Sequence, residues 1–349
     1  MIFKFPFSQI ATALALALSV ESLLAQENLF YQKQKDGSVF FQLQGLKKDA
    51  SYSVQIIDAK SGKKLASIQD FEKDAVPRAL KTTWKPEENL NALCYWNILR
   101  DGENVSPAMQ PVKMPEKFHV GQAKIKRAQN AVTWSQSNPS ISRIFVANRS
   151  GMLIAWVKPW GFSNAGSFIS PWNFKDVGSV RSYRTDSDIH AFVQRVPLNQ
   201  RWIVLGNVPF TAEYAEQELL ANISLPKIPY DFNLSLPGAS LESGEEGTAE
   251  AVYLAKGGMP VRVSLDAESK KKMGGRRFEI LLFLNGEFIH EEAQGVDPYT
   301  FILPEFEGVK GRHHFTVNII DYHGNIASKT LAMEFKTTSS AAKNPATTK

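Results

Sequence analysis

Apolar and polar positions alternate in short runs along most of the chain, and runs with the spacing of a helix are scarce. The runs are rich in β-branched and aromatic residues and are separated by Gly, Pro, Asn and Asp, which is typical of β-sandwiches. One segment, Thr211 to Ala221, has the composition of a short helix with Thr211 at its N-cap. The pattern therefore predicts an all-β chain with one short helix.

One arrangement of these runs occurs twice. In the first copy an apolar run precedes a turn that ends at Gly62, and Trp84 follows; in the second the turn ends at Gly151, and Trp172 follows. The two glycines are 89 positions apart and the two tryptophans 88, so the copies keep their register within one residue. A period of this length suits one small β-sandwich per copy.

Three glycines are predicted to occupy turns. Gly62 and Gly151 each follow a Ser and are expected at positive φ, where a Cβ is costly. Gly286 follows Asn285 between the apolar runs of residues 278–290, which is the strongest short-range signal for a hairpin.

The residue pattern divides the chain into five segments. We expect a signal peptide at residues 1–25, β-sandwich modules at residues 26–115, 116–225 and 226–337, and a disordered tail at residues 338–349. The predicted helix closes the second module or links it to the third. Within the second module, Pro159 to Ser182 is expected to form a long loop, and Arg201 to Leu205 a strand near the end.

The N-terminal segment predicts export to the periplasm, the outer surface or the medium. The apolar run Ile10 to Val20 is too short to span a membrane, which takes about 20 residues. A small residue, Ala25, precedes the expected cleavage point. The alternative is an uncleaved N-terminal anchor. No later segment is long and apolar enough to predict a transmembrane span.

The net charge limits the classes of binding partner that the chain can attract, and the cysteine content limits its thiol chemistry. The net charge is +5, and the second module carries the excess, with 12 basic and 7 acidic residues. Such an excess attracts acidic glycans or lipid headgroups or is only a solvated face. We expect no nucleic-acid partner, because that is the least plausible anionic partner of an exported protein. Cys94 is the only cysteine. We expect a buried, inert strand thiol there, the alternative being a nucleophile.

A family resemblance follows from the repeated segments. A strand, a Ser-Gly turn, a second strand and a Trp resemble the Ig-like module of the flagellar hook-capping protein, in two copies. The third module resembles a bacterial Ig-like domain through its strand Gly311–Val317 and its turn Asp321–Asn325. The resemblance implies three tandem Ig-like β-sandwich modules that serve attachment or assembly, and it implies no catalytic residue.

The sequence predicts neither an enzyme site, a metal site nor a cofactor. The six histidines include no His-x-His or His-x-x-x-His spacing. Glycine-rich phosphate loops and Gly-x-Ser-x-Gly motifs are absent from the sequence. A hydrolase with two carboxylates at a module interface stays open as an alternative. The basic cluster Lys270–Arg277 is interpreted as a solvated loop rather than a glycan or membrane contact.

The candidate ligand-binding residues are Trp160, Phe162, Arg181 and Arg184. The two rings flank Gly161 in the predicted loop of the basic module, and aromatic faces beside basic groups bind sugar rings. A small core beneath the loop would explain the same residues.

These observations favour a non-enzymatic exported cell-envelope protein whose modules support attachment or assembly. Its expected partners are other envelope proteins or a cell-surface polysaccharide. The alternative is a glycan-binding protein that uses the aromatic loop.

Exported protein is expected to lack residues 1–25, because the apolar run is too short to anchor the chain. N-terminal sequencing of the exported material should begin at Gln26. Membrane-bound protein that retains Met1 would contradict the prediction.

Overall fold

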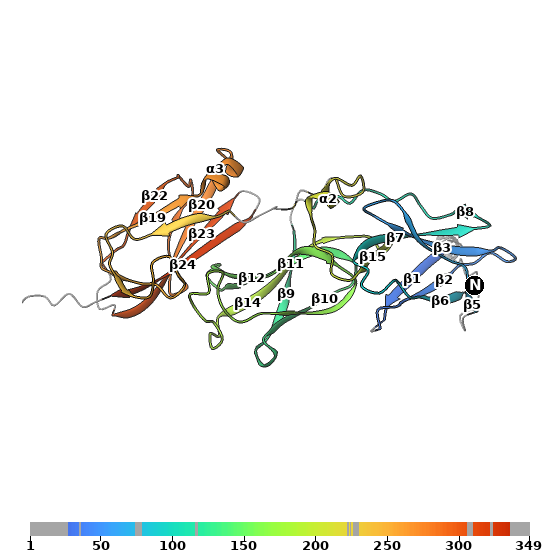
Figure 1. Ribbon diagram of the computed structural model, residues 1–349, viewed down its shortest axis with the longest axis horizontal. Coiled ribbons are helices and arrows are strands. Elements are labelled where there is room, and N and C mark those ends of the chain that lie inside the picture. Colours follow the sequence, from blue (N-terminus) through green and yellow to red (C-terminus); the bar gives the residue numbers. More distant parts are fainter. Residues whose placement is uncertain are drawn as a thin grey trace, which may run out of the picture.

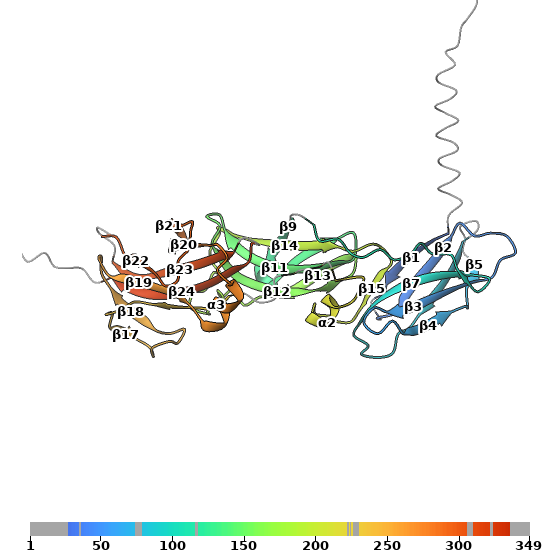
Figure 2. The ribbon, with the colours of Figure 1, turned by 90° about the horizontal axis from the view of Figure 1, so that it is seen from above.

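The chain folds into three β-sandwich modules that lie in a row (Figures 1 and 2). The computed structural model describes residues 27–34, 36–73, 79–115, 118–221, 223, 225, 230–305, 310–321 and 324–335. The predicted signal peptide and the predicted tail lie outside these residues. Strands dominate every module, so the all-β prediction and the tandem sandwich prediction are confirmed.

The first module packs two antiparallel sheets face to face. One sheet has the order β1-β2-β6-β5; the other has the order β15-β7-β3-β4, with β8 on β7. The strands that belong to residues 27–115 are β1 (Asn28–Lys33), β2 (Val39–Gln44), β3 (Tyr52–Asp58), β4 (Lys64–Ile68), β5 (Glu72–Lys73), β6 (Leu80–Trp84), β7 (Ala92–Arg100) and β8 (Glu103–Asn104).

Alternation along these strands builds the first core. Every second residue of β2, from Val39 to Leu43, is buried, and β3 follows the same period from Tyr52. Cys94 on β7 is fully buried in this core, as predicted, and burial raises the pKa of its thiol to about 12. A thiol in that state is a packing residue rather than a nucleophile.

The second module is a six-stranded sheet whose two halves share β9 and pack face to face around one core. Its order is β12-β11-β14-β9-β10-β13, and β9 pairs first with β14 and then with β10. Its elements are β9 (His119–Lys126), a 3-10 turn η1 (Arg127–Gln129), β10 (Ala131–Gln136), β11 (Ser140–Asn148), β12 (Leu153–Ser163), β13 (Gly166–Pro171) and β14 (Ile189–Pro197).

Two predictions for the second module are wrong. The loop predicted from Pro159 to Ser182 is strand in its first part, because β12 continues to Ser163, and β13 occupies more of it. Pro159 is tolerated because β12 is the edge strand of its sheet, where a missing N–H breaks no ladder bond. The strand at 201–205, observed as β15 (Trp202–Leu205), pairs with β7 of the first module.

The third module is a sandwich of a three-stranded and a six-stranded sheet. The orders are β16-β19-β22 and β17-β18-β24-β23-β20-β21. Its strands are β16 (Phe232–Ser235), β17 (Leu241–Ser243), β18 (Val252–Ala255), β19 (Pro260–Leu265), β20 (Phe278–Leu284), β21 (Glu287–Glu292), β22 (Tyr299–Ile302), β23 (Gly311–Asp321) and β24 (Ile326–Phe335).

Two short helices complete the described chain. The predicted helix is present as α2 (Ala212–Ala215) but is shorter than expected, and the Thr211 side chain makes no capping bond. The second helix, α3 (Ala267–Met273), replaces the solvated loop predicted for the basic cluster. Asp266 caps it by accepting a hydrogen bond from the Ser269 N–H at 2.6 Å, and Gly274 ends it in the left-handed conformation.

The three predicted turn glycines have the expected backbone. Their φ angles are 68° at Gly62, 83° at Gly151 and 94° at Gly286. A Cβ added at Gly62 or Gly151 would meet no atom within 4 Å, so the constraint on these two positions is conformational rather than steric.

Gly62→Val and Gly151→Val are each expected to lower the free energy of unfolding by about 1–3 kcal/mol, because a β-branched residue is strained at positive φ. Denaturant unfolding of the full chain measures the loss. Gly178→Ala is the control, because no positive φ constrains that glycine. Unchanged stability in both Val variants would contradict the turn assignment.

Candidate functional site

The first junction, between modules one and two, is made by a strand that crosses from one module into the other. After β14 ends at Pro197, the chain enters the first module as β15 and pairs with β7, placing Ile203 opposite Cys94. All four residues of β15 are buried. The sheet of the first module is therefore completed by residues that follow the second module in sequence.

Side chains from both modules hold β15 in place. The Asn164 side chain, in the turn after β12, accepts a hydrogen bond from Val204 N and donates one to Val204 O, both at 2.7 Å. The Tyr31 hydroxyl donates to Trp202 O at 2.5 Å. Asn164 thereby acts towards Val204 as a neighbouring strand would, satisfying both of its backbone groups.

A continuous apolar core fills the first junction. It draws on β7, β11, β12, β14, β15 and α2 and contains Leu93, Val112, Ile141, Trp160, Phe162, Val196, Leu198, Trp202, Val204, Val208, Tyr214, Leu220, Ile223 and Leu225. The Arg201 guanidinium donates to Trp96 O at 2.9 and 3.0 Å at its margin. Such a core resists bending, because opening it would expose the buried rings to water.

The two predicted ligand-binding rings belong to this core. Trp160 is 9% exposed and Phe162 is 4% exposed. Trp160 packs on Phe118, and Phe162 packs edge-on against Tyr214. The buried-core alternative therefore describes these rings, and an exposed aromatic loop does not.

The two predicted arginines make separate contacts of their own. Arg181 pairs with Asp186 at 3.4 Å and lies 4.6 Å from the ring centre of Tyr183. Arg184 donates to the Asn130 side chain at 2.8 Å. The contacts of the four predicted residues thus belong to two groups, and the structure does not bring the rings and the arginines into one site.

The second junction, between modules two and three, joins two of the predicted turns. The Asn148 side chain accepts a hydrogen bond from Met152 N at 2.9 Å within its own turn. It also donates to Gly286 O at 2.6 Å, at the tip of the β20–β21 hairpin. A Cβ at Gly286 would lie 3.0 Å from the Asn148 amide nitrogen, so this glycine is required for contact as well as for conformation.

Apolar packing supports the second junction. Phe283 of β20 is fully buried in the core of the second module, beside residues such as Met152 and Ile154. The Ser328 hydroxyl of β24 donates to Leu153 O at 3.2 Å. The third module is thus packed onto the second through a side chain that crosses the boundary.

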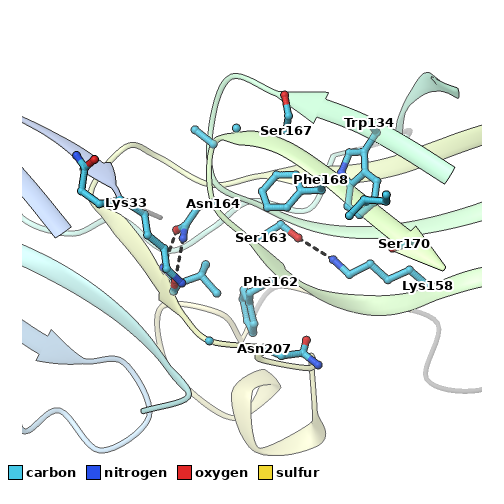
Figure 3. A pocket seen from close by; sticks show the side chains of 16 residues that line it. Lys33, Trp134, Lys158, Phe162, Ser163, Asn164, Ser167, Phe168, Ser170 and Asn207 are labelled. Atoms are coloured by element: carbon cyan, nitrogen blue, oxygen red, sulfur yellow. Dashed lines mark hydrogen bonds between the residues drawn. The ribbon is translucent and has the colours of Figure 1, made fainter. Parts of the chain in front are cut away.

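A hollow of about 580 Å³ opens beside the first junction, and we call it the junction hollow (Figure 3). Lys33 and Gln34 line it from the end of β1, and Gly206 and Asn207 from the end of β15. Val204 of β15 also lines it, and the second module supplies the other walls, which consist of Trp134, Lys158 and Phe162–Ser170.

Lys158 gives the junction hollow its electrostatic character. Its ammonium donates to the Ser163 hydroxyl at 2.7 Å and lies 5.4 Å from the ring centre of Trp134. Burial lowers the pKa of this ammonium to about 8. Among the described residues no salt bridge joins Lys158 to a carboxylate.

Two observations on the described residues concern metal binding and acid–base chemistry. Within those residues, no three His, Cys, Asp or Glu side chains are grouped to hold a metal ion. Burial raises the pKa of Asp176, but this carboxylate accepts the N–H groups of Val180 and Arg181 at 2.7 and 3.3 Å. That role is to hold a loop together.

Neither a protein-family model nor a curated protein matches the chain. Of the helices formed by the described residues, none has the length and apolar character needed to cross a bilayer.

Solved structures resemble the chain over most of its length at low identity. The tetra-tandem repeat in the extending region of a large adhesion protein matches 89% of this chain and 74% of its own, at 14% identity and a TM-score of 0.19. The fibronectin(III)-like modules of Clostridium thermocellum CbhA match 88% and 94%, at 9% identity and a TM-score of 0.19. At TM-scores this low, the likenesses carry neither a fold nor a function to this chain.

Cys94 labelling is expected to report the attachment of β15. The thiol should react slowly in the native protein, and Asn164→Ala should speed the reaction about tenfold, because two buried hydrogen bonds of about 0.5–1.5 kcal/mol each are lost. Asn173→Ala, which removes only a bond within its own turn, is the control. Rapid native labelling, or equal rates in both variants, would contradict this assignment.

Proposed function

We propose that the chain is a non-enzymatic exported cell-envelope protein whose Ig-like modules form a stiff rod for attachment or assembly. The observation that supports this most is that both junctions are packed and hydrogen-bonded. Phe283 enters the core of the second module, and β15 enters the sheet of the first. Modules that act as independent binding units need no such interlocking, whereas a spacer that holds a partner at a fixed distance does.

The elongated arrangement and the turn contacts fit this role. The three modules lie end to end, so the first and the third are separated by the full length of the second (Figure 1). Under this proposal the first two modules are relatives of the flagellar hook-capping Ig-like module, whose Ser-Gly turn is found at Gly62 and Gly151. The partners at the two ends are other envelope proteins or a cell-surface polysaccharide.

The hydrolase alternative receives no support from these observations. It requires two carboxylates about 5–9.5 Å apart in one cleft. Asp176 is occupied by backbone N–H groups, and the lining of the junction hollow contains no Asp or Glu. The neighbouring hollow has Asp36, Glu87 and Glu88 in its lining, but all three are exposed to solvent.

Fractionation of producing cells tests the location, and small-angle X-ray scattering tests the rod. The mature chain is expected in the envelope or outside the cell. The scattering of the purified chain should fit this single elongated form, and Asn148→Ala should add bent conformations, because it removes the hydrogen bond to Gly286. Asn173→Ala is again the control.

Protein confined to the cytosol would contradict export. Wild-type scattering that requires an ensemble of freely hinged modules would contradict the rod, whatever the location.

A further inference from the structure

The junction hollow carries positive charge without a compensating carboxylate. Its charged lining residues are Lys33 and Lys158, and the remaining lining is neutral. An ammonium has three N–H donors, and Ser163 accepts one from Lys158. Removing an unpaired ammonium from water is unfavourable, so a carboxylate entering the hollow would gain an ion pair that the protein itself does not supply.

The walls of the hollow are suited to a ring with hydroxyl groups. Phe168 is half-buried and stacks on Trp134, with ring centres 5.2 Å apart and planes 24° apart. Figure 3 shows this pair on the same side of the hollow as the Lys158 ammonium. Ser167 and Asn207 add neutral hydrogen-bonding groups at the rim. An aromatic face beside neutral donors and acceptors is the surface that sugar rings contact.

The hollow is also held in shape before any ligand arrives. The Gln136 amide donates to Ser163 O and Asn164 O at 3.1 and 2.7 Å, and the Asn164 side chain is fixed by Val204. A wall ordered in this way loses little conformational freedom when a ligand binds. A second hollow shares Lys33 and Gly206 with the first, but Asp36, Glu87 and Glu88 line it, so an anionic ligand is expected to stay in the junction hollow.

We propose that the junction hollow binds a carboxylate-bearing saccharide. Lys158 pairs with the carboxylate, the half-buried Phe168, stacked on the buried Trp134, contacts the sugar ring, and Lys33 attracts the ligand from the rim. This site differs from the one predicted from the sequence, because Trp160 is absent from the lining and Phe162 contributes only part of one wall. The inference goes beyond the rod function and does not rest on it.

Isothermal titration calorimetry with trigalacturonate tests the site. The full chain is expected to bind this probe and to bind its methyl ester at least tenfold more weakly, since the ester keeps the rings and removes the charge. Lys158→Met should weaken trigalacturonate binding at least tenfold. Lys175→Met, a change at an exposed lysine that does not line the hollow, should alter it less than twofold.

Binding should also fall as the pH rises through about 8. The ammonium of Lys158 has its pKa lowered to about 8, so its charge is present below that pH and is lost above it. The carboxylate is ionised above about pH 5, which places the strongest binding at about pH 5–7. Lys33, the other charged lining residue, is on the exposed rim. In Lys158→Met the decline near pH 8 should disappear.

Melting curves of the variants show whether a loss of binding is due to a loss of folding. If Lys158→Met fails to fold, Lys33→Met provides a second variant and should weaken binding about threefold. No binding of trigalacturonate at millimolar concentration, or equal binding of the methyl ester, overturns the proposal. So does tighter binding of a sulfated neutral trisaccharide, or of a tripeptide with a free terminal carboxylate.

Discussion

The pairing of β15 with β7 is the constraint on which the arrangement of the first two modules depends. β14 ends at Pro197 and β15 begins at Trp202, so only four residues separate a strand of the second module from a strand of the first. A connection this short does not allow a large change in the angle between the two modules while β15 remains in its sheet. The junction core, the grip of Asn164 on Val204 and the walls of the junction hollow all follow from that fixed placement.

The second junction reaches a similar result by a different physical route. Among the described residues no strand passes from one of these modules into the other; instead, the turn of one hairpin contacts the turn of another, and Phe283 is buried in the neighbouring core. A turn is useful for this purpose because its backbone carbonyl is available outside the sheet ladder. Gly286 O is such a group, and the Asn148 amide reaches it while its carbonyl oxygen holds its own turn.

Local geometry could be predicted from the sequence, and long-range pairing could not. The positive φ at Gly62, Gly151 and Gly286 follows from Ser-Gly and Asn-Gly signals that act within a few residues. Helix α3 could also have been predicted, because Asp266 and Gly274 are ordinary N-cap and C-cap residues around the lysine cluster. The pairing of β15 with β7 could not be predicted, because the sequence of a buried strand does not indicate which sheet edge the strand will join.

At the candidate site, too, local features could be predicted from the sequence and long-range contacts could not. Trp160 and Phe162 were correctly associated with one local segment, but Pro159 and Gly161 suggested a loop, and only the sheet edge explains why they belong to a strand. The sequence around Lys158 does not indicate a binding site, because nothing near this residue in the chain shows that β1 and β15 approach it. The junction hollow exists only because two modules meet, so its residues carry no joint signal.

The order in which β7 and β15 are synthesised has a consequence for the newborn protein. About 100 residues separate the two strands, and a ribosome adds about 5–20 residues per second, so β7 waits about 5–20 s for its partner. During that interval its edge presents unpaired N–H and C=O groups, which are a template for association with other chains. The register partner of Cys94 is missing for the same time. A fragment that ends at residue 115 would keep this edge open permanently.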